Sequence, residues 1–203
     1  MIKIFGFGTL VLKESSLMTC PNLQNFQPAM TENAARVFGK VNLRAAYRGD
    51  VNWDEMKVAS CFLEEKQGSQ VMGVTYDIPE NDWPNLRARE LDYDCRQIDI
   101  CDLDGNPQGK ALTFFGYPND EKFLGMMSEG DQIYLTSRRK GYEDAIYRQG
   151  IYPAESYIEK CMNAFSHAEA GMMENFLDNS FLADRETTLR SYLEKNYPEL
   201  LKS

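Results

Sequence analysis

The stretch Phe5-Gly6-Phe7-Gly8-Thr9-Leu10 ends an apolar N-terminal strand in two closely spaced glycines. Glycine lets a ligand approach the backbone closely, and successive N–H groups at a strand-to-turn junction form a concave site for an anion. A second segment, Arg89-Glu90-Leu91-Asp92-Tyr93, offers a carboxylate at the end of a predicted helix. If the fold brings the two segments together, they can hold a small charged molecule and move a proton on it.

Length and composition predict the broad class of protein. The 203 residues carry 22 basic and 31 acidic side chains, for a net charge of −9. We expect one domain over 1–203, with a strand-rich body over about 1–137 and a helical part over about 153–203. An acidic chain whose largest basic cluster is Arg138-Arg139-Lys140 is not expected to bind nucleic acid or an anionic membrane surface. Its oligomeric state is open.

The distribution of apolar residues and cysteines predicts a cytoplasmic protein. The N-terminal apolar run meets glycines too soon for a signal peptide, and no apolar run approaches the 18 or so residues of a spanning helix. The five cysteines are an odd number without Cys-x-x-Cys spacing, which is typical of reduced thiols.

Apolar periodicity predicts an α+β arrangement around one core. Strands are expected over 1–7, 34–47 (bent near Gly39), 58–63, 71–78, 95–101 and 110–115, with hairpin turns at Gln67-Gly68-Ser69 and Asp102-Leu103-Asp104-Gly105-Asn106. Residues 19–33 are expected as loop, and 117–150 as irregular with a short strand over 132–135. Helices are expected after the caps Ser15/Ser16 and Asp82, over about 155–168, around 176–181, and over 189–197.

The glycine turn has a plain alternative. A dinucleotide-binding fingerprint needs Gly or Ala at position 11, where Val11 stands, and a long following helix, which Pro21 prevents. The Walker phosphate-binding pattern is absent as well. On pattern alone, a tight turn without a ligand is the more common explanation.

Glu90 also has a plain alternative, because a Glu beside Arg87 and Arg89 on a helix is usually a solvated surface residue. If the helix end instead faces a pocket, burial would raise the pKa of Glu90 and make it a proton carrier near neutral pH. Other catalytic groups are scarce. His167 is the sole histidine, and the pairs Asp102/Asp104 and Asp92/Asp94 are typical of turns rather than of metal sites.

Four segments together resemble a known family. Phe5-Gly6-Phe7-Gly8-Thr9-Leu10 resembles the N-terminal Tyr-Gly-Ser-(Asn)-Leu signature of the gamma-glutamylcyclotransferases, especially their ChaC-like branch. Gly68-Ser69-Gln70-Val71-Met72-Gly73-Val74-Thr75-Tyr76 is similar to their Gly-x-x-Val-x-Gly-Val-x-Tyr strand. Leu86 to Tyr93 is similar to their Leu-x-x-Arg-Glu-x-x-Tyr segment, and Pro153-Ala154-Glu155-Ser156-Tyr157, with Cys161 and Gly171, to a stretch of bacterial relatives.

The resemblance implies a small mixed barrel-like β-sheet with flanking helices, and an intramolecular cyclisation. The α-amine of a γ-glutamyl substrate attacks its own γ-carbonyl and releases 5-oxoproline, without a metal or other cofactor. By the same resemblance, Glu90 is the catalytic acid and base, and Phe7, Gly8, Thr9 and Leu10 hold the γ-glutamyl group, largely through backbone N–H groups on its α-carboxylate.

Two positions depart from the family signature, since Phe7 replaces its Tyr and Thr9 its Ser. These two positions bear on which substrate fits the glycine turn. The leading hypothesis is a cyclotransferase acting on γ-glutamyl peptides or amines, glutathione among them. The alternatives are a cyclotransferase acting on a γ-glutamyl amide of a larger molecule, and a binding module of the same fold that holds a small carboxylate without turnover.

Overall fold

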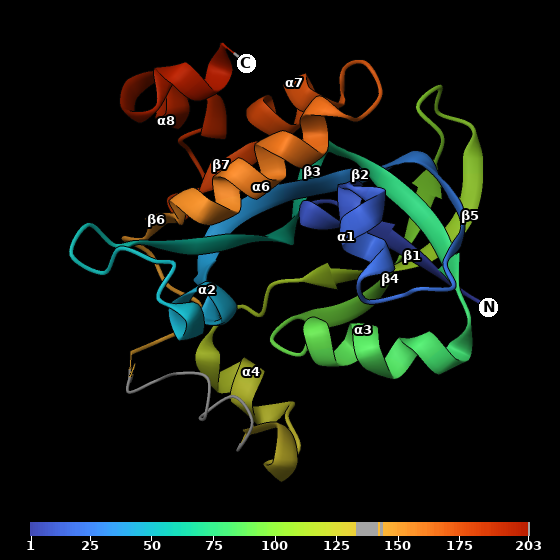
Figure 1. The fold of residues 1–203 in the computed structure, drawn as a ribbon, viewed down its shortest axis with the longest axis horizontal. Coiled ribbons are helices and arrows are strands. Elements are labelled where there is room, and N and C mark those ends of the chain that lie inside the picture. Colours follow the sequence, from blue (N-terminus) through green and yellow to red (C-terminus); the bar gives the residue numbers. More distant parts are fainter. Residues whose placement is uncertain (133–141, 143, 203) are drawn as a thin grey trace.

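Five strands close into a barrel at the centre of the molecule (Figure 1). The computed structural model describes residues 1–132, 142 and 144–202. The barrel strands follow one another in the order β3-β1-β5-β4-β2, and β2 pairs back with β3 to close the ring. The β1–β5 pair is parallel, and the other four pairs are antiparallel. The strands are β1 (Ile2–Gly6), β2 (Gln24–Val41), β3 (Lys57–Ile78), β4 (Asp94–Cys101) and β5 (Pro107–Phe115).

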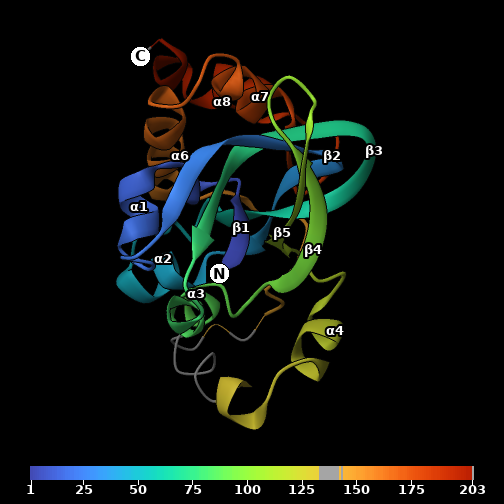
Figure 2. The same cartoon turned by 90° about the vertical axis from the view of Figure 1, so that its right-hand side faces the viewer.

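Helices flank the barrel. In Figures 1 and 2, α6 and α7 lie above it and α3 lies below it. Two short strands, β6 and β7, extend the sheet by parallel pairing with β3 and β2. The α+β mixed barrel with flanking helices predicted above is therefore confirmed. The helices and short strands are α1 (Lys13–Leu17), α2 (Leu43–Arg48), α3 (Trp83–Arg89), α4 (Asp120–Gly125), β6 (Tyr152–Pro153), α6 (Glu155–Ser166), α7 (Met172–Asp178), β7 (Ser180–Leu182) and α8 (Leu189–Asn196), with 3₁₀ turns η1 (Thr9–Val11), η2 (Glu80–Asp82) and η3 (Pro198–Leu201).

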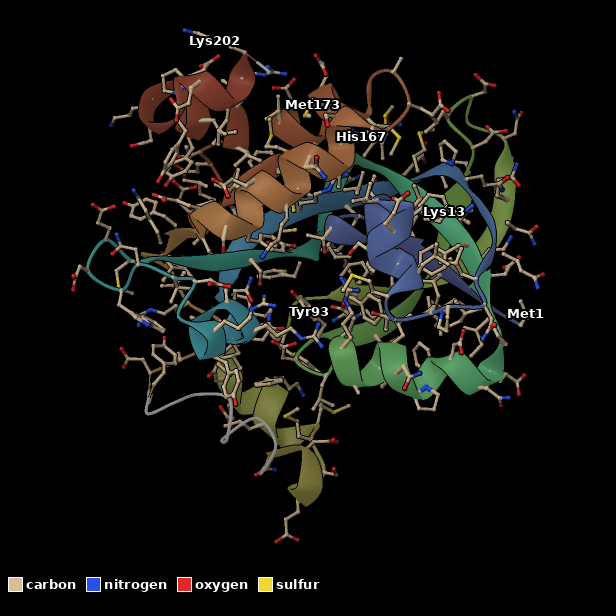
Figure 3. All side chains as sticks on the ribbon, in the orientation of Figure 1. Met1, Lys13, Tyr93, His167, Met173 and Lys202 are labelled. Atoms are coloured by element: carbon tan, nitrogen blue, oxygen red, sulfur yellow. The ribbon has the colours of Figure 1, made fainter. Side chains whose placement is uncertain are left out.

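The core fills the barrel with aromatic and aliphatic side chains, and Tyr93, labelled in Figure 3, is one of the buried residues packed in this core. One close approach fixes where β1 ends. A Cβ atom on Gly73 would lie 2.2 Å from the carbonyl oxygen of Gly6, so only glycine lets β3 pass this close to the end of β1. None of the described helices is long and apolar enough to cross a membrane.

The two longest strands differ from the sequence prediction. The loop expected over 19–33 is confirmed only over 19–23, because β2 begins at Gln24 and pairs with the second half of β3. The hairpin expected at 67–69 is wrong, since β3 continues through it as one strand. Gly68 has φ +78° and donates its N–H to the side chain of Asn33 at 3.1 Å. Its turn-like conformation is therefore part of a bulge in the pairing of β2 with β3. The bend near Gly39 is confirmed by a register shift between Phe38 and Lys40.

Several local predictions also differ. Residues 43–48 form α2 rather than the end of a strand, because the Asn42 side chain accepts a hydrogen bond from the N–H of Ala45 and caps a helix. Ser16 does not cap α1 but donates to the carbonyl of Leu10. Asp82 stands at the N-cap position of α3, as predicted, but its carboxylate accepts from the N–H of Asn22 and not from the helix.

Within 117–150, the helix α4 forms where irregular structure was expected. Of the strand expected over 132–135, residue 132 is described, and the other three lie outside the described residues. The β4–β5 hairpin and the helices predicted from 155 and from 189 are confirmed. All five cysteines are unpaired thiols.

Candidate active site

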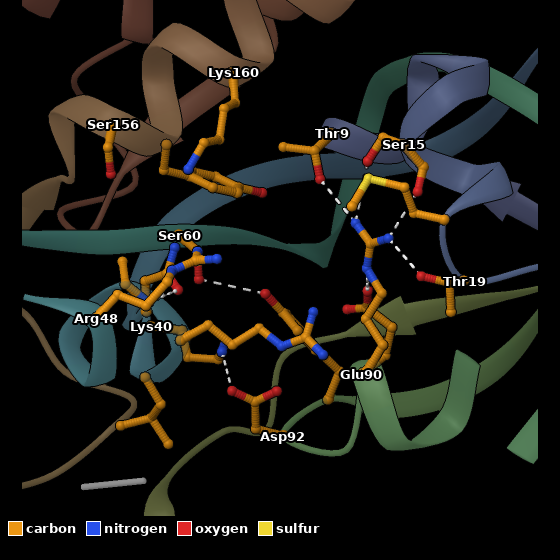
Figure 4. A pocket seen from close by; sticks show the side chains of 18 of the residues that line it. Thr9, Ser15, Thr19, Lys40, Arg48, Ser60, Glu90, Asp92, Ser156 and Lys160 are labelled. Carbon is orange, nitrogen blue, oxygen red and sulfur yellow. Dashed lines mark hydrogen bonds and ion pairs between the residues drawn. The ribbon is translucent and has the colours of Figure 1, made fainter. Parts of the chain in front are cut away.

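A cavity of about 610 Å³ opens between the glycine turn with α1, the helix α2, the C-terminal end of α3, and α6. Its volume lies within the range typical of small-molecule sites. Figure 4 shows Thr9, Ser15 and Thr19 on one side of it, Glu90 and Asp92 at its base, and Lys160 reaching in from α6. The polar and charged side chains that line the cavity are Thr9, Glu14, Ser15, Thr19, Lys40, Asn42, Arg44, Arg48, Ser60, Arg89, Glu90, Asp92, Tyr93, Ser156, Tyr157, Lys160 and Asn163.

Glu90 supplies a buried carboxyl group to this cavity. It ends α3, where its N–H donates to the carbonyl of Leu86 at 3.0 Å, and only 14% of its side chain is exposed. Burial raises the pKa of Glu90 above its ordinary value, because the charged form loses water. The Arg89 guanidinium opposes this shift, and the Asp92 carboxylate adds to it. A carboxyl group in such surroundings is better able to exchange protons near neutral pH than an exposed one.

Arg89 joins the two segments singled out in the sequence. Its Nε lies 3.0 Å from a carboxylate oxygen of Glu90. The other end of the guanidinium donates to the hydroxyl of Thr19 at 2.8 Å, the carbonyl of Ser15 at 3.0 Å and the hydroxyl of Thr9 at 3.3 Å (Figure 4). The end of α3 is therefore tied to the glycine turn by one arginine. The plain alternative for Glu90, a solvated surface residue, is wrong, because its side chain is only 14% exposed and lines the cavity.

The glycine turn lies beside the cavity. The first N–H group to donate within η1 is that of Val11, which donates to the carbonyl of Gly8 at 3.0 Å. The N–H groups of Gly8, Thr9 and Leu10 come before it and are not used by the hydrogen bonds of the turn. A Cβ atom on Gly8 would lie 3.0 Å from the hydroxyl of Tyr157, which lines the cavity. A side chain at position 8 would therefore require the Tyr157 hydroxyl to shift by a few tenths of an ångström.

The five predicted site residues do not all reach the cavity. Thr9 and Glu90 line it, and Gly8 is buried beside its wall. The side chains of Phe7 and Leu10 are buried in the core instead, with 7% and 6% exposed. The ring of Phe7 therefore does not face the cavity. Phe7 and Leu10 can contribute their backbone atoms to the site and their side chains to the packing of the core.

A buried arginine holds the glycine turn from behind. Arg36 of β2 is fully buried, and its Nε donates to the carbonyl of Phe7 at 2.7 Å. Its other nitrogens donate to the carbonyl of Met72 and, at 3.1 Å, to the side-chain oxygen of Asn175. Burial lowers the pKa of Arg36 to about 10, which leaves it charged at neutral pH. Arg36 was not among the predicted site residues, and its signal in the sequence is a basic residue within the otherwise apolar run 34–38.

A second carboxylate and a lysine lie next to Glu90. Lys40, with 2% of its side chain exposed, forms an ion pair with Asp92, and its Nζ lies 4.2 Å from the centre of the Tyr93 ring. The hydroxyl of Tyr93 is 3.3 Å from that of Ser60, and the hydroxyl of Tyr147 donates to the carbonyl of Asp92. Asp92 lies in a turn, as predicted, and it also lines the cavity.

The charge of the cavity is opposite to that of the chain. Five basic side chains (Lys40, Arg44, Arg48, Arg89 and Lys160) and three acidic ones (Glu14, Glu90 and Asp92) line it, while the whole chain is acidic. Such a lining favours an anionic ligand. Among the described residues, no group of three His, Cys, Asp or Glu side chains is arranged to hold a metal ion.

Solved structures with a similar fold were found by comparison. A gamma-glutamyl cyclotransferase specific to glutathione from yeast is similar over 86% of this chain and 94% of its own, with 14% sequence identity and a TM-score of 0.51. YkqA from Bacillus subtilis is similar over 85% of this chain and 51% of its own, with 16% identity and a TM-score of 0.53. No protein-family model and no curated protein sequence matches the chain.

These similarities define the class of fold, which is that of the gamma-glutamyl cyclotransferases. The resemblance inferred from the four sequence segments is thus confirmed for the fold. A shared fold at this sequence identity does not determine an activity, which depends on the residues that line the cavity.

Proposed function

We propose that this protein is a γ-glutamyl cyclotransferase that releases 5-oxoproline from a γ-glutamyl peptide or amine, with glutathione as one candidate substrate. The observation that carries the proposal is the buried carboxyl group of Glu90, joined through Arg89 to the glycine turn at the edge of one cavity.

The reaction needs two proton transfers between nitrogens of the same substrate. The α-ammonium group must lose a proton before its nitrogen can attack the γ-carbonyl carbon and form the five-membered ring. A second proton leaves this nitrogen as the lactam forms. The departing nitrogen gains one proton as its bond to the γ-carbon breaks and a second when the freed amine becomes an ammonium group. One carboxylate that accepts from the first nitrogen and donates to the second is sufficient.

The raised pKa of Glu90 favours these proton transfers. An α-ammonium group has a pKa of about 8, so transfer to an ordinary carboxylate is uphill by more than 3 pKa units. Raising the pKa of Glu90 brings the pKa values of donor and acceptor closer together, and the charge of Arg89 opposes part of that rise. Ring closure supplies its own nucleophile, so positioning and one proton carrier can account for catalysis.

The remaining lining groups have consistent roles in this proposal. The amides of Gly8, Thr9 and Leu10 hold the α-carboxylate of the γ-glutamyl group, and Arg36 fixes the turn that carries them by binding the carbonyl of Phe7. Arg89 is a positioning residue that keeps Glu90 facing this turn.

The proposal is tested by incubating the purified protein with glutathione, γ-glutamylalanine and a γ-glutamyl amine, and by measuring 5-oxoproline by chromatography against a heat-denatured blank. Product above the blank from any of the three is the expected result. Absence of product from all three would contradict the proposal. In that case, binding of the same compounds measured by calorimetry would favour the alternative of a binding module.

A further inference from the structure

One face of α6 forms the wall of the cavity that stands across from Glu90. Ser156, Lys160 and Asn163 are spaced by four and three residues, so they lie on one stripe of the helix, and all three line the cavity. The opposite face, with Ile158, Cys161 and Phe165 among others, is buried in the core. The orientation of this polar stripe is therefore fixed by the packing of the helix.

Lys160 provides the positive charge of this stripe. It reaches from α6 into the cavity, on the side away from Glu90 and Thr19 (Figure 4). Within the described residues, no acidic group lies within ion-pair distance of its Nζ. Arg48, at the end of α2, adds a second positive charge on the same side, although it is paired with Asp50 at 3.2 Å.

The two ends of the cavity therefore differ. At one end, the carboxyl group of Glu90 and the amides of the glycine turn suit the ammonium and carboxylate of a γ-glutamyl group. At the other end, Lys160 offers a positive charge to whatever is attached beyond the γ-carbonyl.

We propose that Lys160 is a specificity residue that binds a carboxylate on the leaving part of the substrate. This inference rests on the proposed cyclotransferase activity and deepens it. The preferred substrates are γ-glutamyl amino acids and peptides, whose leaving amine carries a carboxylate, over γ-glutamyl compounds whose leaving amine is neutral. Because Lys160 is exposed, its effect is modest, about threefold to fivefold in kcat/KM, and falls as salt is added.

The test compares two substrates that differ only at the proposed contact, γ-glutamylalanine and γ-glutamylalaninamide. Kinetics of 5-oxoproline release are measured for the wild type, for Lys160→Gln, and for Lys195→Gln. The last variant is the matched control, because it removes the same charge from an exposed position of α8 outside the cavity.

We expect the wild type and Lys195→Gln to prefer the acid substrate, and Lys160→Gln to lose that preference through a higher KM for the acid alone. Equal use of both substrates by the wild type, or an unchanged preference in Lys160→Gln, would overturn the inference while leaving the cyclotransferase proposal intact. Absence of 5-oxoproline from both substrates would overturn the proposed function, and the inference with it.

Discussion

Replacing Arg89 with Met tests how the site is assembled. Arg89 is 14% exposed and links Glu90 to Ser15, Thr19 and Thr9 by an ion pair and several hydrogen bonds. Methionine fills a similar volume but can make none of these bonds. The variant therefore separates the end of α3 from the glycine turn without removing the carboxyl group of Glu90.

The size of the effect follows from these contacts. Hydrogen bonds to a charged group contribute about 1.5–3 kcal/mol each, but they are not additive, so a loss of about 2–4 kcal/mol in the free energy of unfolding is expected. For a chain of this length, that corresponds to a fall in Tm of about 5–15 °C. The larger effect is on activity, where a catalytic group displaced by about 1 Å costs about 100-fold in rate.

The pH dependence gives a second and independent readout. Since the Arg89 charge lowers the pKa of Glu90, its removal raises that pKa, and the acidic limb of the kcat/KM profile moves to higher pH. Arg96→Met is the matched control, because Arg96 is 40% exposed and forms ion pairs with Asp94 and Glu65 outside the cavity. It should change stability by less than about 1 kcal/mol and leave the pH profile unchanged. An Arg89→Met protein with kcat/KM within twofold of the wild type and an unmoved acidic limb would refute the reasoning.

Two further predictions concern the groups around this pair. The Asp92 charge raises the pKa of Glu90, and the Lys40 charge lowers it. Asp92→Asn should therefore move the acidic limb of kcat/KM to lower pH, and Lys40→Met should move it to higher pH. Both are checked by pH–rate profiles, and shifts in the same direction would contradict the assignment of this limb to Glu90. Arg36→Met leaves the buried carbonyl of Phe7 without its donor and should lower the free energy of unfolding by about 3–5 kcal/mol, as measured by urea denaturation; a loss below about 1 kcal/mol would show that Arg36 does not fix the turn.

Elements with local signals could be predicted from the sequence. The β4–β5 hairpin follows from alternating residues on either side of Asp102-Leu103-Asp104-Gly105-Asn106, where the Asp102 side chain accepts hydrogen bonds from the N–H groups of Asp104 and Asn106. Helix α6 follows from its apolar stripe. In both, the interactions that decide the structure lie within a few residues of each other.

Elements that depend on distant partners could not be predicted in the same way. The first part of β2 contains Asn25 and Pro28, which read as loop, and it is held as a strand by the second half of β3. Local signals at Gly68 indicate a hairpin turn, but the partner strand overrides them.

The same limit applies to the site. The sequence could nominate Glu90 and the glycine turn, but the inward orientation of Arg89 and the burial of Lys40 beside Asp92 arise from tertiary packing. The apolar periodicity of a helix as short as α3 does not show which way its last residues face. For this reason, the places of Arg36, Lys40, Arg89 and Asp92 in the site were not predicted.

The most direct test of the account is 5-oxoproline release by Glu90→Gln. Glu14→Gln is the matched control, since Glu14 lines the same cavity but is exposed. The account predicts that Glu90→Gln lowers kcat by about 100- to 10,000-fold while the protein still binds the substrate, and that Glu14→Gln stays close to the wild type. A Glu90→Gln protein that releases 5-oxoproline at the wild-type rate would contradict the central claim that Glu90 carries the proton.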